Sequence, residues 1–209
     1  MLRLISLFSV LFGLLPDQSE AKESSRPNII WIVVEDASPN ISCYGETTIQ
    51  TPNIDRLAKE GVRFQNAFVT CPVCSPSRSA MVTGMYQTTL GAHNHRSQTA
   101  SGKGKGTPAY FESYKLPVKT IPRLFKDAGY WTCNSGNGQP NAKFGKTDYN
   151  FIWNRNDYDG ADWKGRAEDQ SFFAQIQLRG GKNRPAKHAT DPGKVQLPPY
   201  YPNNEVMRK

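Results

Sequence analysis

The residues best suited to chemistry lie in one stretch, CPVCSPSRSAMVTG, at residues 71–84. Arg78 follows Cys74 by four residues, a spacing that returns both side chains to the same side of a helix. The turn before them predicts a helix from about Ser77 to Thr83, with Cys74 just ahead of its N-terminus. Backbone N–H groups and the helix dipole at such an end favour a bound anion. The stretch therefore predicts a cysteine-centred site for an anionic group, with the Arg78 guanidinium neutralising charge.

The cysteine content leaves a second interpretation of this stretch open. The chain has four cysteines, at positions 43, 71, 74 and 133. Cys71 and Cys74 form a C-x-x-C pair, so a thioredoxin-like dithiol with a thiol pKa lowered by the helix N-terminus is an alternative. A structural zinc site needs four ligands, and the other two cysteines lack a matching pair spacing. Zinc is therefore a poor interpretation.

An acidic pair follows the first predicted strand. Residues 29–34 read IIWIVV, a continuous apolar run typical of a strand buried on both faces. The run ends at Glu35 and Asp36. Ligands of open α/β sheets bind at the carboxyl ends of the strands. We therefore expect the acidic pair at the ligand-binding edge of a central strand.

Helices and strands are expected to alternate along the chain. Thr51 is the expected N-cap of a helix that has Pro52 at its first position and ends at Gly61. Beyond this helix the sequence predicts, in order, a strand over 62–69, the helix of the cysteine stretch, a loop over 97–117, a helix over 121–128 capped by Gly129, a strand over 130–133 and an apolar segment over 171–178. This alternation predicts parallel strands and the α/β class.

The first residues are typical of a secretory leader. Arg3 precedes an apolar run over residues 4–15, and small residues follow, which predicts a signal peptide over 1–21. No later stretch reaches the roughly 18 apolar residues that a membrane-spanning helix needs. We therefore expect an exported chain, periplasmic or secreted, with a domain over residues 26–209.

The charge of the chain favours anionic partners. The formal net charge is +8, so sulfated or acidic glycans are candidate ligands. The basic residues between 102 and 187 are interrupted by glycine, proline and aspartate, and they form no helical stripe and no aromatic ribonucleoprotein-type motif. Nucleic acid is therefore a weak interpretation.

The ordered series of motifs resembles the type I sulfatases. It comprises a strand ending in an acidic pair, TPNIDRL at residues 51–57, Cys-x-Pro-Ser-Arg with Thr83-Gly84, and Gly-Tyr ahead of a lysine. GMYQTTLGAHNHRS and KTDYNF are most similar to the branch that contains heparan N-sulfatase and its bacterial relatives. The resemblance covers most of residues 26–180. It implies an alkaline-phosphatase-like α/β/α sandwich with a mostly parallel sheet.

The resemblance also implies a chemistry. In this family a formylglycine-generating enzyme oxidises the cysteine, here Cys74, to an aldehyde whose hydrate attacks the sulfur of a sulfate ester. Arg78 is then implied to be catalytic. A divalent cation, usually Ca²⁺, is implied to be held by Asp36, Glu35 and the modified Cys74, although Glu35 stands where the family often has aspartate.

Three further residues receive implied or candidate roles near the sulfate. Lys146 is the nearest match to a catalytic, sulfate-binding lysine, with Asp148 where the family often has histidine and Lys143 as a competing candidate. His93 is a candidate substrate contact, because histidine suits oxygen-ligated calcium poorly. The implied substrate is a sulfated glycan or another sulfate ester.

Parts of the family pattern have no match. No Asp-Asn pair follows residue 180, and Arg179-Gly180-Gly181 stands where a histidine is expected. We therefore expect an apparently truncated, N-terminal portion of the catalytic domain, with an unpaired strand edge and little or no turnover by these 209 residues alone. The alternatives are a non-catalytic sulfatase remnant or binding protein and a periplasmic thiol-disulfide protein that uses Cys71 and Cys74.

Overall fold

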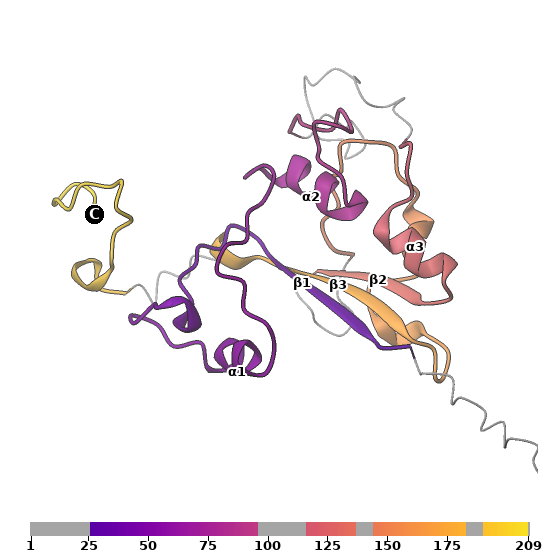
Figure 1. Ribbon diagram of the computed structural model, residues 1–209, viewed down its shortest axis with the longest axis horizontal. Helices are drawn as coiled ribbons and strands as arrows, with labels where there is room; N and C mark the ends of the chain where they lie inside the picture. The colour runs from indigo at the N-terminus through magenta and orange to yellow at the C-terminus, as the bar shows by residue number, and fades with distance from the viewer. Residues whose placement is uncertain (1–25, 96–115, 137–143, 183–189, 209) are drawn as a thin grey trace, which may run out of the picture.

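The computed structural model describes residues 26–95, 116–136, 144–182 and 190–208 (Figure 1). The predicted leader, nearly all of the predicted loop over 97–117, and Lys143 lie outside these residues. No helix in the described ranges is long and apolar enough to cross a membrane.

A three-stranded parallel sheet lies at the centre of the fold, in the order β1-β3-β2. Its strands are β1 (Ile29–Val34), β2 (Trp131–Gly136) and β3 (Phe172–Leu178). The central strand β3 reads FFAQIQL and is buried along nearly its whole length, as a strand paired on both sides requires. The predicted α/β class and parallel pairing are confirmed, and β2 extends three residues beyond the expected Cys133.

Two helices lie against the sheet, α2 (Cys74–Thr83) and α3 (Ile121–Asp127) (Figure 1). Phe125 of α3 stacks on Phe173 of β3, with ring centroids 4.5 Å apart. The largest buried apolar cluster joins the end of α2 to the chain beyond Lys146, and consists of Val82, Leu90, Ala92, Tyr149 and Phe151. This cluster supports the helix that begins at Cys74.

Helix α2 begins earlier than the sequence predicted. Val73 is its extended N-cap residue, so Cys74 is the first helical residue rather than a residue ahead of the helix. Pro76 then falls within the first turn, where its missing N–H has no partner to lose. Cys74 is thus the first residue of a regular α-helix.

Helix α1 (Pro52–Glu60) lies away from the sheet and has no buried residue (Figure 1). Thr51 is its N-cap, as predicted, but the Thr51 hydroxyl donates to Ser42 and Asp55 instead of accepting from a helix N–H. The helix is joined in this way to the short 3₁₀ helix η1 (Ser42–Tyr44). Its apolar residues therefore stay exposed within the described structure.

Two strand predictions were wrong. Residues 62–69 form no strand, because no neighbouring strand in the described residues offers them backbone partners, and Phe68 is 88% exposed. Strand β1 was expected to be buried on both faces, but Ile30, Ile32 and Val34 are about half exposed. The described helices α2 and α3 leave this side of β1 uncovered.

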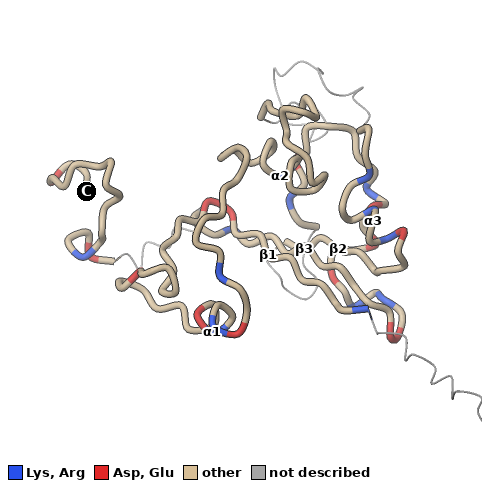
Figure 2. The backbone as a smooth tube through the Cα atoms, in the orientation of Figure 1, with Lys and Arg blue, Asp and Glu red and all other residues tan. Residues whose placement is uncertain are grey.

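Charged residues are interspersed along the described chain (Figure 2). On α3, Arg123 pairs with Asp127 at 2.8 Å across one helical turn, and Lys119 reaches the same carboxylate at 2.7 Å. Lys126 of this helix pairs with Asp159 at 2.6 Å. These pairs connect α3 to the segments beside it.

Candidate active site

Cys74 lies in an open cavity of about 440 Å³ beside the carboxyl end of β1. Polar and reactive members of the lining are Cys71, Cys74, Arg78, Glu35 and Asp36. The rest of the lining is mostly apolar and comes from β1, α2 and the segments next to them, among them Ile32, Val69 and Met81. The acidic pair and the cysteine stretch thus line the same cavity at the carboxyl end of β1.

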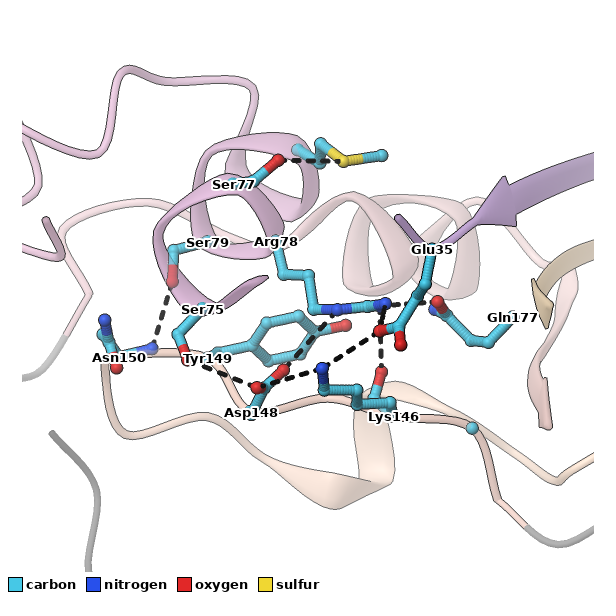
Figure 3. A network of polar contacts seen from close by, with 12 residues as sticks. Glu35, Ser75, Ser77, Arg78, Ser79, Lys146, Asp148, Tyr149, Asn150 and Gln177 are labelled. Atoms are coloured by element: carbon cyan, nitrogen blue, oxygen red, sulfur yellow. Dashed lines mark hydrogen bonds and ion pairs between the residues drawn. The ribbon is translucent and has the colours of Figure 1, made fainter. Parts of the chain in front are cut away.

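Arg78 is the centre of a dense polar network (Figure 3). Its side chain is only 6% exposed, and its guanidinium forms an ion pair with Glu35. It also donates to Gln177 Oε1 at 2.5 Å and to the Lys146 carbonyl at 3.3 Å, and Nε lies 3.5 Å from Asp148. A buried guanidinium with these partners has one well-defined position.

Lys146 joins the same network from the segment that follows β2. Its Nζ lies 3.0 Å from Glu35 Oε1 and 3.5 Å from Asp148 Oδ2. Arg78 and Lys146 thus share the two carboxylates, and all four groups are largely shielded from water. The two cations converge near the N-terminus of α2, which adds its own positive potential.

The backbone at the acidic pair is constrained by two glycines after β3. Asp36 adopts a left-handed conformation, with φ at 50°. The Gly181 N–H donates to the Glu35 carbonyl at 2.9 Å, and a Cβ on Gly180 would lie 2.0 Å from that oxygen. Glycine is therefore required at position 180, in the segment where the family resemblance led us to expect a histidine. The contacts of Gly180 and Gly181 with the backbone of the acidic pair hold Asp36 in its left-handed conformation.

The described residues do not complete a cation site. No group of three or more histidine, cysteine, aspartate or glutamate side chains among them is arranged to hold a metal ion. Glu35 is already paired with Arg78 and Lys146, and calcium takes six to eight oxygen ligands. Asp36 and Glu35 alone fall well short of that number.

The histidine beside the network is His95 rather than His93. His95 Nδ1 lies 3.4 Å from Ser75 Oγ, and Ser75 donates to Asp148 at 3.3 Å. His93 is exposed on the loop that follows α2, and its substrate contact stays a prediction. The sequence led us to His93, but the spacing of a His-x-His pair does not indicate which of the two side chains faces the site.

Two buried amides near Arg78 were missed at the sequence level. Gln177 and Asn134 are 5% and 0% exposed, and each hydrogen-bonds to the other and to the site. A signal was present, because glutamines alternate in the otherwise apolar strand FFAQIQL and buried polar groups need partners. Behind them, Tyr158 donates to Gln175 at 2.7 Å, and burial raises the pKa of its partner Tyr149 to about 12.

The cysteines differ in environment. Cys133 is fully buried in β2, and burial raises the pKa of its thiol to about 12, so it is unsuited to nucleophilic chemistry. Cys71 and Cys74 are partly exposed in the cavity and are not joined by a disulfide. Position 74 is therefore the accessible thiol at the helix end.

Comparison with known proteins gives a consistent result. The family model described as Sulfatase matches residues 27–185. The ulvan-active sulfatase of Formosa agariphila is 38% identical over 161 residues, which are 75% of this chain and 25% of that protein. The N-acetylglucosamine-6-O-sulfatase of Bacteroides thetaiotaomicron is 33% identical over 118 residues, 56% of this chain and 18% of its own length. The chain thus spans about a quarter or less of the length of these relatives.

A solved structure supports the fold. A crystal structure from Bacteroides thetaiotaomicron, assigned to the sulfatases, aligns with a TM-score of 0.52 at 22% identity. The alignment covers 75% of this chain and 36% of the other. The expected fold class is confirmed, while the heparan N-sulfatase branch stays a prediction.

Proposed function

The chain belongs to the sulfatase family, and on this premise we propose that it acts in the hydrolysis of sulfate esters or N-sulfate groups. The observation that carries the proposal is the convergence of Arg78 and Lys146 beside the helix end that begins at Cys74. Two shielded cations and a helix N-terminus are the groups that bind a sulfate. In this proposal Cys74 is the residue that reacts with it.

The proposed chemistry requires a modified Cys74. A hydrated formylglycine would supply a geminal diol: one hydroxyl would attack sulfur and displace the alcohol or amine of the substrate, and loss of the proton of the other hydroxyl would then expel sulfate as the aldehyde re-forms, to be rehydrated by water. Arg78 would hold the oxygen at position 74 and neutralise charge, and Lys146 would bind a sulfate oxygen. Glu35 and Asp148 would keep both cations in place. A formylglycine-generating enzyme is the partner that this maturation needs.

We include Ca²⁺ in the proposal with Asp36 as one ligand. Glu35 and the modified Cys74 remain candidate ligands, but Glu35 would first have to leave two cations that it contacts. The described residues supply too few oxygens for a calcium shell, so the others must come from elsewhere.

The substrate class that we propose is a sulfated glycan. Relatives named for ulvan and for N-acetylglucosamine 6-O-sulfate support it, as does the net charge of +8. We further propose export to the periplasm or the medium after removal of residues 1–21, with 26–209 forming part of the catalytic domain.

The test is a titration of the full chain with inorganic sulfate, followed by an assay for sulfate release. We expect sulfate binding that is lost in R78A and strongly weakened in K146M, with Lys59→Met on exposed α1 as the charge-matched control. Any sulfate release from N-acetylglucosamine 6-sulfate, of which we expect little or none from these 209 residues alone, should require co-production with the maturation enzyme and should be absent in C74A. Sulfate binding that is indifferent to both Arg78 and Lys146 would overturn the proposal.

A non-catalytic binding protein is the second candidate. It is favoured by the absence, among the described residues, of three side chains that could hold a cation. Sulfate binding that requires Arg78 without any Cys74-dependent release, in the presence of Ca²⁺ and the maturation enzyme, would support this alternative.

A further inference from the structure

A closed ring of hydrogen bonds lies on the side of Arg78 that faces the sheet. Arg78 Nη1 donates to Gln177 Oε1 at 2.5 Å, and Gln177 Nε2 donates to Asn134 Oδ1 at 3.4 Å. Asn134 Nδ2 donates to the Gly145 carbonyl at 3.4 Å, and Arg78 Nη1 also donates to the carbonyl of the next residue, Lys146, at 3.3 Å. The ring closes through the backbone of Gly145 and Lys146, and so connects the Arg78 guanidinium with the backbone that carries Lys146.

The loop that carries Lys146 sits directly on these amides. The Gly145 N–H donates to the Asn134 carbonyl at 3.0 Å. A Cβ on Gly145 would lie 2.3 Å from Asn134 Oδ1 and 2.8 Å from Gln177 Cγ. The loop can approach this closely only because the residue is glycine, and any displacement of the amides is transmitted to Lys146.

The amide side chains of the ring are neutral, whereas the carboxylates on the other side of Arg78 are charged. Glu35 and Asp148 hold Arg78 and Lys146 by opposite charge, and each therefore lowers the net positive potential that an anion meets. Gln177 and Asn134 fix the same two groups with neutral dipoles. Burying such amides inside the fold is costly unless they are hydrogen-bonded, and an apolar residue would pack there without that requirement, so their presence calls for a role beyond packing.

We propose that Gln177, held by Asn134, is a positioning residue that sets the geometry of Arg78 and Lys146 for a sulfate without reducing their charge. It acts through Arg78 and the Gly145–Lys146 segment and has no contact with the anion of its own. The inference rests on the proposed function only in assigning Arg78 and Lys146 to the sulfate.

The first test compares Q177M with Q175M in the full chain. Gln175 lies on the same strand and face as Gln177 and is also buried, but its side chain accepts from Tyr158 instead of Arg78. Both variants remove one buried amide, so both should lower thermal stability. Only Q177M should weaken the binding of inorganic sulfate, by about tenfold, the worth of one hydrogen bond to a charged group.

The second test asks whether the guanidinium beside Gln177 is the group that meets the sulfate. Q177E keeps the acceptor oxygen for Arg78, loses the donor to Asn134 and adds negative charge, so it should bind sulfate about tenfold or more weakly than the unaltered chain at neutral pH. Q175E adds the same charge two residues away and should change sulfate affinity by no more than about twofold. Because a negative charge beside Arg78 weakens anion binding whatever holds Arg78 in place, the positioning role itself is decided by Q177M against Q175M.

The outcomes are distinguishable. Unchanged sulfate affinity in Q177M and Q177E, with weakened binding in R78K, would overturn the positioning role and leave the proposed function standing. Equal weakening by the Gln175 and Gln177 variants would also overturn it. Absence of sulfate binding in the unaltered chain would overturn both proposals. A side-chain Nε–H resonance of Arg78 that shifts in Q177M but not in Q175M provides an independent spectroscopic check.

Discussion

Two regions of the molecule differ in how far their side chains are buried. The site layer, comprising α2, β3 and residues 144–151, contains buried aromatic rings and a network in which every described cation has a carboxylate or amide partner. The α1 segment, residues 39–70, contains no buried residue, and even its large apolar side chains Leu57 and Phe64 are 60% and 67% exposed. The site layer is therefore organised by its own contacts, whereas the α1 segment contributes little to a shared core.

The comparison suggests where substitutions should matter. In the site layer a change removes partners from groups that water cannot reach, so the loss is large. In the α1 segment the same chemical change is compensated by solvent. Paired substitutions, one in or next to the site layer and one in the α1 segment, can therefore sharpen or break the contrast.

The largest difference is expected for arginine. R78A should lower the free energy of unfolding by about 3–5 kcal/mol, because Glu35 and Lys146 lose a buried partner. R63A in the α1 segment should cost less than about 1 kcal/mol, since Arg63 is exposed and lies over the Tyr44 ring. Urea unfolding of both variants measures the two losses. Equal losses would break the comparison.

The next largest difference concerns glycine. G180A should cost about 3 kcal/mol, because φ is +51° and the added Cβ would collide with the Glu35 carbonyl. G45A has φ +98° but open space around it, so only the conformational cost of about 1–2 kcal/mol applies. Thermal unfolding should rank the two variants in this order. A larger loss for G45A would show that the packing on the acidic pair is unimportant.

Tyrosine hydroxyls should give a smaller contrast. Y158F removes a buried hydroxyl that bonds both Tyr149 and Gln175, and should cost about 1–3 kcal/mol. Y44F removes an exposed hydroxyl that donates to the Phe64 carbonyl, and should cost less than about 1 kcal/mol. Denaturant midpoints of the two variants test this. Indistinguishable midpoints would contradict the account.

The smallest effect is a pH dependence. Burial raises the pKa of Asp159, but hydrogen bonds from Lys126 and Thr132 outweigh it and leave the pKa below the usual 3.8. A lowered folded-state pKa stabilises the fold above the unfolded pKa, and this stabilisation is lost as pH falls through the folded value.

D159N should therefore flatten the loss of stability below about pH 4, measured as urea midpoints across the acid range. The control is E46Q in the α1 segment, because a hydrogen bond from the Thr48 side chain also lowers the pKa of Glu46, which is partly exposed. A steeper change for E46Q than for D159N would reverse the comparison.

The sequence predicted the central features of the site because they depend on local order. The strand that ends at Glu35, the helix at Arg78 and the parallel pairing follow from apolar runs and turn residues along the chain. The position of the acidic pair at the carboxyl end of β1, where it lines a cavity with Cys74, agrees with the α/β rule that ligands bind at strand ends.

The features that sequence did not predict depend on contacts between distant segments. Gln177 and Asn134 acquire their importance only when β2 and β3 bring them beside Arg78. Similarly, the exposed side of Ile32 and the absence of a strand over 62–69 depend on which elements lie opposite. An apolar pattern indicates which side chains tend to be buried, but it does not show which elements cover them.

The central claim is that Cys74 is the modified residue of a sulfate site. Mass spectrometry of the peptide that carries Cys74, after co-production of the chain with a formylglycine-generating enzyme, tests it most directly. The account predicts an aldehyde at position 74 in place of the thiol, with Cys71 unmodified as the internal control. An unmodified Cys74 thiol, or a disulfide between Cys71 and Cys74, would contradict it.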